Sequence, residues 1–181
     1  MRAIPKPAAG EYPPYAAMYI DLLPDDGRVL AHLEEQGHLV AEFFRALPPD
    51  RHTYRYAPGK WTPKEILLHV VDDERIYACR ALRFARGDET ELPGFDQDPF
   101  AAASGADARS LESLLAEHAA VRTSTLCLFD NLPDAAWMRS GVANGARVTV
   151  RALAWHMAGH ELHHLRILRE RYQPARRAGG R

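Results

Sequence analysis

The segment from residue 149 to residue 172 constrains the fold most, because its inward-facing positions recur at helical spacing. Successive positions lie four, three, four, three and four residues apart, which is typical of a helix that packs against others in a bundle. These positions are Leu153, Met157, His160, His164, Ile167 and Arg171. The pattern predicts a long helix here with two histidines on its buried side.

Three further segments carry apolar residues at helical spacing and are also expected to be long helices. They cover residues 27–47, 62–86 and 108–130. The second has the clearest start, with Thr62 as N-cap, Pro63 at the first helical position and Glu65 three residues after the cap. A shorter helix is expected over residues 15–23, because Pro24 would stop it.

The connections between these helices are long and rich in glycine, proline and aspartate. Residues 87–107 and 131–148 are expected to be irregular and without strands, apart from a tight turn at Asn144-Gly145. The sequence therefore predicts an all-α four-helix bundle with long crossover connections. An N-terminal arm (1–14), one bundle domain (15–173) and a disordered tail (174–181) account for the 181 residues.

Composition and charge exclude several classes of protein. The net charge of −1 offers no basic surface for nucleic acid. No apolar run approaches the roughly 18 residues of a membrane span, and none at the N-terminus resembles a signal peptide. We therefore expect a cytoplasmic protein that acts on a small molecule, with Cys79 and Cys127 as buried thiols.

His160 and His164 are four residues apart, so their rings lie one turn apart on one helix face. Burying two imidazoles side by side is costly without partners, and two protonated rings would repel each other. A divalent cation removes both costs, because neutral imidazole is a good ligand for Zn, Ni or Fe. His69, two turns into the helix that follows Thr62, is the candidate for a third ligand.

Other residues near these three have weaker assignments. Asp73 and Glu74 follow His69 by about one turn and are candidates for orienting a histidine ring or accepting a proton. His156 can be a fourth ligand or a neighbouring group, and His163 is expected at the rim. The remaining histidines have no partner at ligand spacing and are treated as ordinary; they are His32, His38, His52 and His118.

An alternative interpretation is a zinc protease, since residues 160–164 match H-E-x-x-H with Glu161 as general base. The longer metzincin form fails, because Ile167 and Glu170 stand where its glycine and last histidine would be. We also expect no strand edge that would hold a peptide. The protease is the weakest of the functional hypotheses.

Two stretches together resemble the DinB superfamily, including its YfiT-like metal-dependent hydrolase branch. They are Lys60-Trp61-Thr62-Pro63-Lys64-Glu65-Ile66-Leu67-Leu68-His69-Val70-Val71-Asp72-Asp73-Glu74 and Ala158-Gly159-His160-Glu161-Leu162-His163-His164-Leu165. The resemblance spans residues 15 to 172 and places His69, His160 and His164 at the family's metal triad. It implies an up-down-down-up bundle, a Zn or Ni ion (with Fe or Mn as further options) and frequently a homodimer.

The resemblance implies two chemistries and leaves a third hypothesis open. Relatives include metal-dependent hydrolases and enzymes that transfer low-molecular-weight thiols, such as bacillithiol or mycothiol, to small electrophiles. In a thiol transferase, Arg80 or Arg122 on inward-leaning helix faces can contact the thiol's polar groups. The alternative is a non-catalytic stress-response or binding module, in which the metal only ties two helices together.

Overall fold

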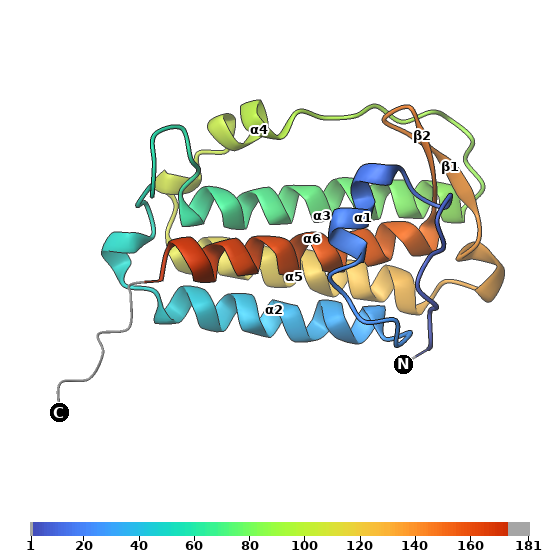
Figure 1. The fold of residues 1–181 in the computed structure, drawn as a ribbon, viewed down its shortest axis with the longest axis horizontal. Helices are drawn as coiled ribbons and strands as arrows, with labels where there is room; N and C mark the ends of the chain where they lie inside the picture. The colour runs from blue at the N-terminus through green and yellow to red at the C-terminus, as the bar shows by residue number, and fades with distance from the viewer. Residues whose placement is uncertain (1, 174–181) are drawn as a thin grey trace.

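The computed structural model describes residues 2–173, and four long helices dominate it (Figure 1). They are α2 (Val29–Ala46), α3 (Pro63–Ala85), α5 (Leu111–Asp130) and α6 (Val150–Arg171). Each begins and ends within three residues of its expected position. Helix α3 begins as predicted, with a capping box in which the Thr62 hydroxyl accepts from Glu65 N and the Glu65 carboxylate accepts from Thr62 N.

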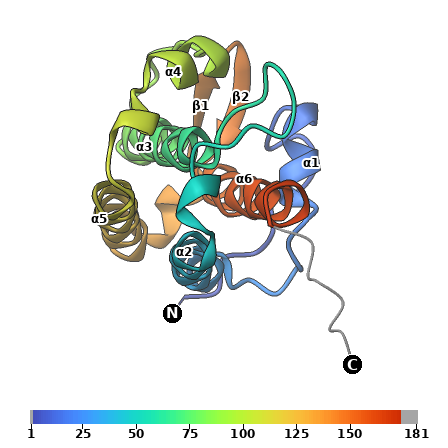
Figure 2. The ribbon, with the colours of Figure 1, turned by 90° about the vertical axis from the view of Figure 1, so that its left-hand side faces the viewer.

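The four helices form a ring in which α3 contacts α5 and α6, and α2 contacts the same two (Figure 2). Consecutive helices α2 and α3 therefore lie diagonally opposite each other. Helices α2 and α6 run in one direction while α3 and α5 run in the other (Figure 1). This is the expected up-down-down-up bundle, and the parallel pair α3 and α5 requires the long crossover of residues 86–110.

The crossover and the N-terminal region cover the bundle with short elements. The crossover contains α4 (Gln97–Ala103), which packs on α3. Before α2, a 3-10 turn (Pro14–Ala16) leads into α1 (Ala17–Ile20), which packs on α6. The predicted arm contributes to the core, because Ile4 is buried and its carbonyl accepts a hydrogen bond from Trp155 Nε1. The predicted disordered tail lies outside the described residues.

Two sequence-based expectations were wrong. The connection predicted to be irregular over residues 131–148 forms two antiparallel strands, β1 (Ser140–Ala143) and β2 (Ala146–Thr149, one residue beyond the predicted range), joined by the predicted turn at Asn144-Gly145. Both turn residues have positive φ (52° and 71°), as a two-residue hairpin requires. These strands have only four residues each and few β-branched side chains, so their pairing leaves little signal in the sequence.

The second wrong expectation concerns the cysteines. Cys79 and Cys127 are exposed rather than buried.

The core is divided into two apolar clusters by a polar layer. Along all four long helices, residues of one cluster give way to residues of the other at the same level of the bundle. Buried polar side chains occupy that level, namely Gln36 on α2, Asp73 and Glu74 on α3, His118 and Arg122 on α5, and His160 and Glu161 on α6. Because buried polar groups are costly unless partnered, this layer is where a site is expected.

Gly159 allows α1 to approach α6 beside this layer. A Cβ built at Gly159 would lie 2.3 Å from the Tyr19 carbonyl oxygen, and backbone cannot yield as a flexible side chain can. We therefore expect Gly159→Ala to displace α1 and lower the free energy of unfolding by about 1–3 kcal/mol. Urea denaturation measures this, with Gly37→Ala as control, because a Cβ at that helical glycine would lie 3.5 Å or more from its neighbours. A Gly159→Ala variant as stable as the wild type would contradict the described packing.

In the part of the chain from 2 to 173, no helix combines the length and apolar character needed to cross a membrane.

Candidate metal centre

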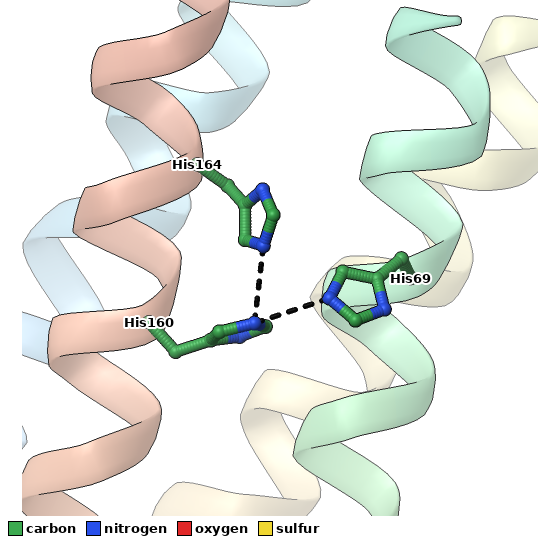
Figure 3. A group of neighbouring side chains, drawn as sticks. All are labelled: His69, His160 and His164. Carbon is green, nitrogen blue, oxygen red and sulfur yellow. Dashed lines mark hydrogen bonds between the residues drawn. The ribbon is translucent and has the colours of Figure 1, made fainter. Parts of the chain in front are cut away.

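Three histidine rings converge in the polar layer (Figure 3). The Nε2 atom of His160 lies 3.1 Å from Nε2 of His69 and 3.1 Å from Nε2 of His164. Each of the three residues offers a ring nitrogen within 4.8 Å of those of the other two. The three predicted metal ligands are therefore brought together.

Local helix geometry and packing produce this arrangement. His160 and His164 lie one turn apart on α6, and His69 faces them from the neighbouring helix α3. Trp61, just before the α3 cap, lies with its ring centroid 4.8 Å from that of His69 and 6.4 Å from that of His164. This indole covers one side of the cluster.

The cluster suits a cation chemically. Burial lowers the pKa of His69 to about 4. Burial and the neighbouring histidines hold the pKa values of His160 and His164 well below the usual range. All three rings are therefore neutral near pH 7, which is the form that binds metal. Tetrahedral zinc with nitrogen ligands at about 2.0–2.1 Å implies nitrogens about 3.3 Å apart, close to the two contacts of 3.1 Å.

Asp73 is positioned to orient the central histidine. Its Oδ2 atom lies 3.3 Å from His160 Nδ1, on the side of the ring opposite the cluster. That oxygen is buried and has no hydrogen bond of good geometry within residues 2–173. Burial raises the pKa of Asp73 to about 8, while the charge of Arg80 acts in the opposite direction. A proton on His160 Nδ1 would satisfy the carboxylate and leave the Nε2 lone pair facing the other two rings.

We expect Asp73→Asn to weaken zinc affinity by about 10–100-fold, because an amide orients and polarises the ring less well than a carboxylate. Competition with a chromophoric chelator measures the affinity. Asp72→Asn is the matched control, since Asp72 is adjacent but half-exposed and contacts Arg75. Equal zinc affinity in the Asp73→Asn variant and the wild type would refute the role of Asp73.

Glu74, the other carboxylate proposed for catalysis, is engaged elsewhere. Both of its carboxylate oxygens accept hydrogen bonds from Arg122 on α5. Glu161, the general base of the protease hypothesis, accepts from Arg122 and makes a 2.7 Å hydrogen bond with His118. Neither carboxylate is available to a substrate at the histidines, which argues against a protease.

The sequence interpretation missed the buried group formed by Glu74, His118, Arg122 and Glu161. His118 had been treated as ordinary, yet it is 2% exposed and paired. The available signal was the four-residue spacing of His118 and Arg122, which places two polar side chains on one face of α5. Burial raises the pKa of Glu161, but Arg122 and His118 outweigh it and lower that pKa overall.

His156 and His163 lie beside the cluster and outside it. The His156 ring stacks on Tyr77 with centroids 4.2 Å apart, and it is 5.8 Å from the His160 ring. His163 is half-buried, with its ring 5.3 Å from that of Tyr19. Within the described chain, only His69, His160 and His164 form a group with ligand spacing.

His156 also predicts how acid affects the metal-free protein. Burial lowers its pKa to about 3, whereas the unfolded chain titrates near 6.5. The unfolded state therefore binds the proton first, so stability present above pH 6.5 is lost as pH falls. We expect His156 alone to remove about 2 kcal/mol between pH 7 and pH 5. Denaturant titrations of metal-free wild type and His156→Phe should differ by that amount in their pH dependence, and parallel pH profiles would contradict it.

Two cavities reach the cluster from different sides. One, of about 340 Å³, touches His160 and is also lined by residues that include Tyr15, Tyr19, Asp73, Tyr77, Arg80, Phe95 and His156. We call it the tyrosine cavity. The other, also about 340 Å³, touches His164 and Trp61. Gln97, at the start of α4, lines both. Small molecules therefore have room beside two of the three histidines.

Comparisons with known proteins agree with the four-helix bundle described above. The sequence profile of the DinB superfamily matches residues 32–168. YfiT from Bacillus subtilis, described as a probable metal-dependent hydrolase with an unusual four-helix bundle topology, superposes with a TM-score of 0.73 at 16% identity, covering 81% of this chain and 85% of its own. A DinB-like protein, YjoA, from the same organism superposes with a TM-score of 0.56 at 18% identity, covering 81% and 93%. Among curated proteins, none matches the chain in sequence.

Proposed function

The chain belongs to the DinB superfamily, and from that premise we propose that it is a metal-dependent enzyme acting on small molecules. His69, His160 and His164 would hold one divalent cation, zinc or nickel before iron or manganese. The convergence of three neutral imidazole nitrogens, with cavities on two sides, carries this proposal. Three protein ligands with room for another are typical of catalytic rather than structural zinc sites.

When bound, a dication lowers the pKa of a coordinated water to about 7 or deprotonates a coordinated thiol. The chain's own residues supply the rest of the chemistry. Asp73 holds the His160 ring through Nδ1, and the Trp61 ring packs against that of His69. The ring of Tyr19 lies 5.2 Å from that of His160, and burial raises the pKa of its phenol. Tyr19 therefore stays protonated and can donate a hydrogen bond to a substrate in the tyrosine cavity.

Hydrolysis and thiol transfer differ in which nucleophile enters the site, so one pair of assays separates them. Protein loaded with zinc or nickel is incubated with 4-nitrophenyl acetate, and separately with N-acetylcysteine and monochlorobimane. We expect metal-dependent turnover in at least one assay and its loss in His160→Ala. Ester hydrolysis without metal-dependent conjugation would discard the thiol route.

The non-catalytic module is the alternative that these assays also test. In that case the metal would tie α3 to α6, its removal would sharply lower stability, and neither substrate would turn over.

We further propose that the protein is a cytoplasmic homodimer. Light scattering should then give about twice the chain mass of 20.3 kDa.

A further inference from the structure

A buried arginine that no carboxylate contacts directly borders the tyrosine cavity. Arg80 is 5% exposed, and its guanidinium lies 4.9 Å from the centre of the Tyr77 ring. Its Nη2 atom donates to the Pro93 carbonyl at 2.9 Å. Within residues 2–173, no carboxylate oxygen lies within 4.0 Å of its nitrogens. Buried charges are normally paired, so an ion partner from outside the chain is expected.

Arg122, also buried, shows what pairing looks like in this protein. Its guanidinium contacts the carboxylates of both Glu74 and Glu161. The cavity has two carboxylates of its own, but neither pairs with Arg80. Asp73 lies against His160, and Asp96 accepts from the backbone N–H of Asp98. An arginine has five N–H donors. Arg80 lines the cavity, and only its bond from Nη2 to Pro93 is formed within residues 2–173.

Backbone hydrogen bonds hold the segment that contacts Arg80 in place. The hairpin tip pairs with residue 92, since Leu92 N donates to the Val142 carbonyl and Asn144 N donates to the Leu92 carbonyl. Gly94 lies close to the Asn144 side chain there, since a Cβ at that position would lie 2.1 Å from Asn144 Oδ1. These contacts fix the carbonyl of Pro93, and thereby the guanidinium. A pre-positioned cation binds an anion at less cost in ordering.

We propose that the tyrosine cavity binds a small organic oxyanion, with its charged oxygens on Arg80 and its carbon skeleton between the rings of Tyr15, Tyr19 and Phe95. Assigning this anion to the substrate rests on the proposed function, whereas the binding itself requires no metal. The two ends of the cavity limit the ligand's length. Arg80 follows Asp73 by seven residues, about 10 Å along α3, and its side chain leans back toward the helix start. A ligand that reaches from Arg80 to the level of Asp73 within the cavity is therefore a small molecule.

The probe for this site is phenylacetate, with phenylacetamide as its neutral counterpart and phenyl phosphate as a second oxyanion. Calorimetric titration of EDTA-treated wild type should show phenylacetate binding at least about 10-fold more tightly than phenylacetamide. Arg80→Met should weaken phenylacetate binding by about 10–100-fold. Arg80→Lys keeps the positive charge but lacks the planar guanidinium with its paired donors, so it should retain part of the affinity for phenylacetate. The preference between phenylacetate and phenyl phosphate identifies the carboxylate or phosphate class.

Arg83→Met is the matched control, because Arg83 lies on the same helix but pairs with Asp88 at the surface. It should bind phenylacetate like the wild type. Equal affinity for phenylacetate and phenylacetamide, or unchanged phenylacetate binding in Arg80→Met, would overturn the proposal. If Arg80→Met does not fold, the phenylacetate affinity of Arg80→Lys and the preference of the wild type for phenylacetate over phenylacetamide still test the proposal.

Metal content separates this proposal from the proposed function. Zinc bound per chain should be the same in Arg80→Met and the wild type. If phenylacetate binds only to zinc-loaded protein, the anion sits on the metal and the Arg80 site is wrong. If phenylacetate binding depends on Arg80 while zinc fails to bind the histidines, the anion site stands and the metal centre does not.

Discussion

Replacing His160 with alanine should reduce bound zinc from about one ion per chain to almost none. His160 is the central ligand, with its Nε2 atom 3.1 Å from Nε2 of both His69 and His164. Zinc-binding free energies of about 10–16 kcal/mol, shared among four ligands, amount to about 3 kcal/mol for each ligand, which corresponds to more than 100-fold in affinity. Elemental analysis after dialysis against a weak chelator measures the occupancy.

His163→Ala is the matched control for this experiment. His163 lies next to His164 on α6 but is outside the cluster, so its removal should leave zinc occupancy unchanged. His69→Ala should lose zinc as His160→Ala does, although His69 is 91 residues away in the chain. If His69→Ala retained the ion while His156→Ala lost it, the ligand set would be wrong.

Replacing Arg122 with methionine should lower the free energy of unfolding by about 3–5 kcal/mol. Arg122 on α5 contacts the other three long helices, through Glu74 on α3, Glu161 on α6 and the Leu33 carbonyl on α2. Methionine fills much of the same volume but leaves two buried carboxylates without their cation. For a chain of this size, that loss corresponds to a fall in Tm of about 10 °C. Thermal and urea unfolding of the metal-free protein measure it.

Arg75→Met is the control for loss of an arginine that is ion-paired at the surface. Arg75 contacts Glu117 with about half of its side chain exposed, so its loss should cost less than about 1 kcal/mol. Adding Glu74→Gln to Arg122→Met should restore part of the stability, because one uncompensated charge is removed. Equal losses in Arg122→Met and Arg75→Met would show that the buried network contributes little.

Features that depend on neighbours along the chain were predictable. The α3 cap follows from Thr62, Pro63 and Glu65, which lie within one helical turn. The facing pair on α6 follows from the four-residue spacing of His160 and His164, and the turn of the hairpin from Asn144-Gly145. The assignment of His69 as a metal ligand had less support from its own position, since a single histidine on an apolar helix face does not indicate a metal site. Its place was supported by the family resemblance, and the DinB superfamily is now shown.

Features that depend on which helix faces which were decided by the tertiary structure. Asp73 and Glu74 are adjacent on α3, yet one lies against His160 and the other against Arg122, because successive helical residues point about 100° apart. Arg80 donates to the Pro93 carbonyl and shares a cavity wall with Asn144, because the crossover and the hairpin tip lie against this part of α3. The helices, their caps and their polar faces could be predicted from the sequence, since these arise from interactions within a few residues. Packing between segments tens of residues apart selected which polar faces meet, and so placed the histidines, the buried network and the arginine in their present surroundings.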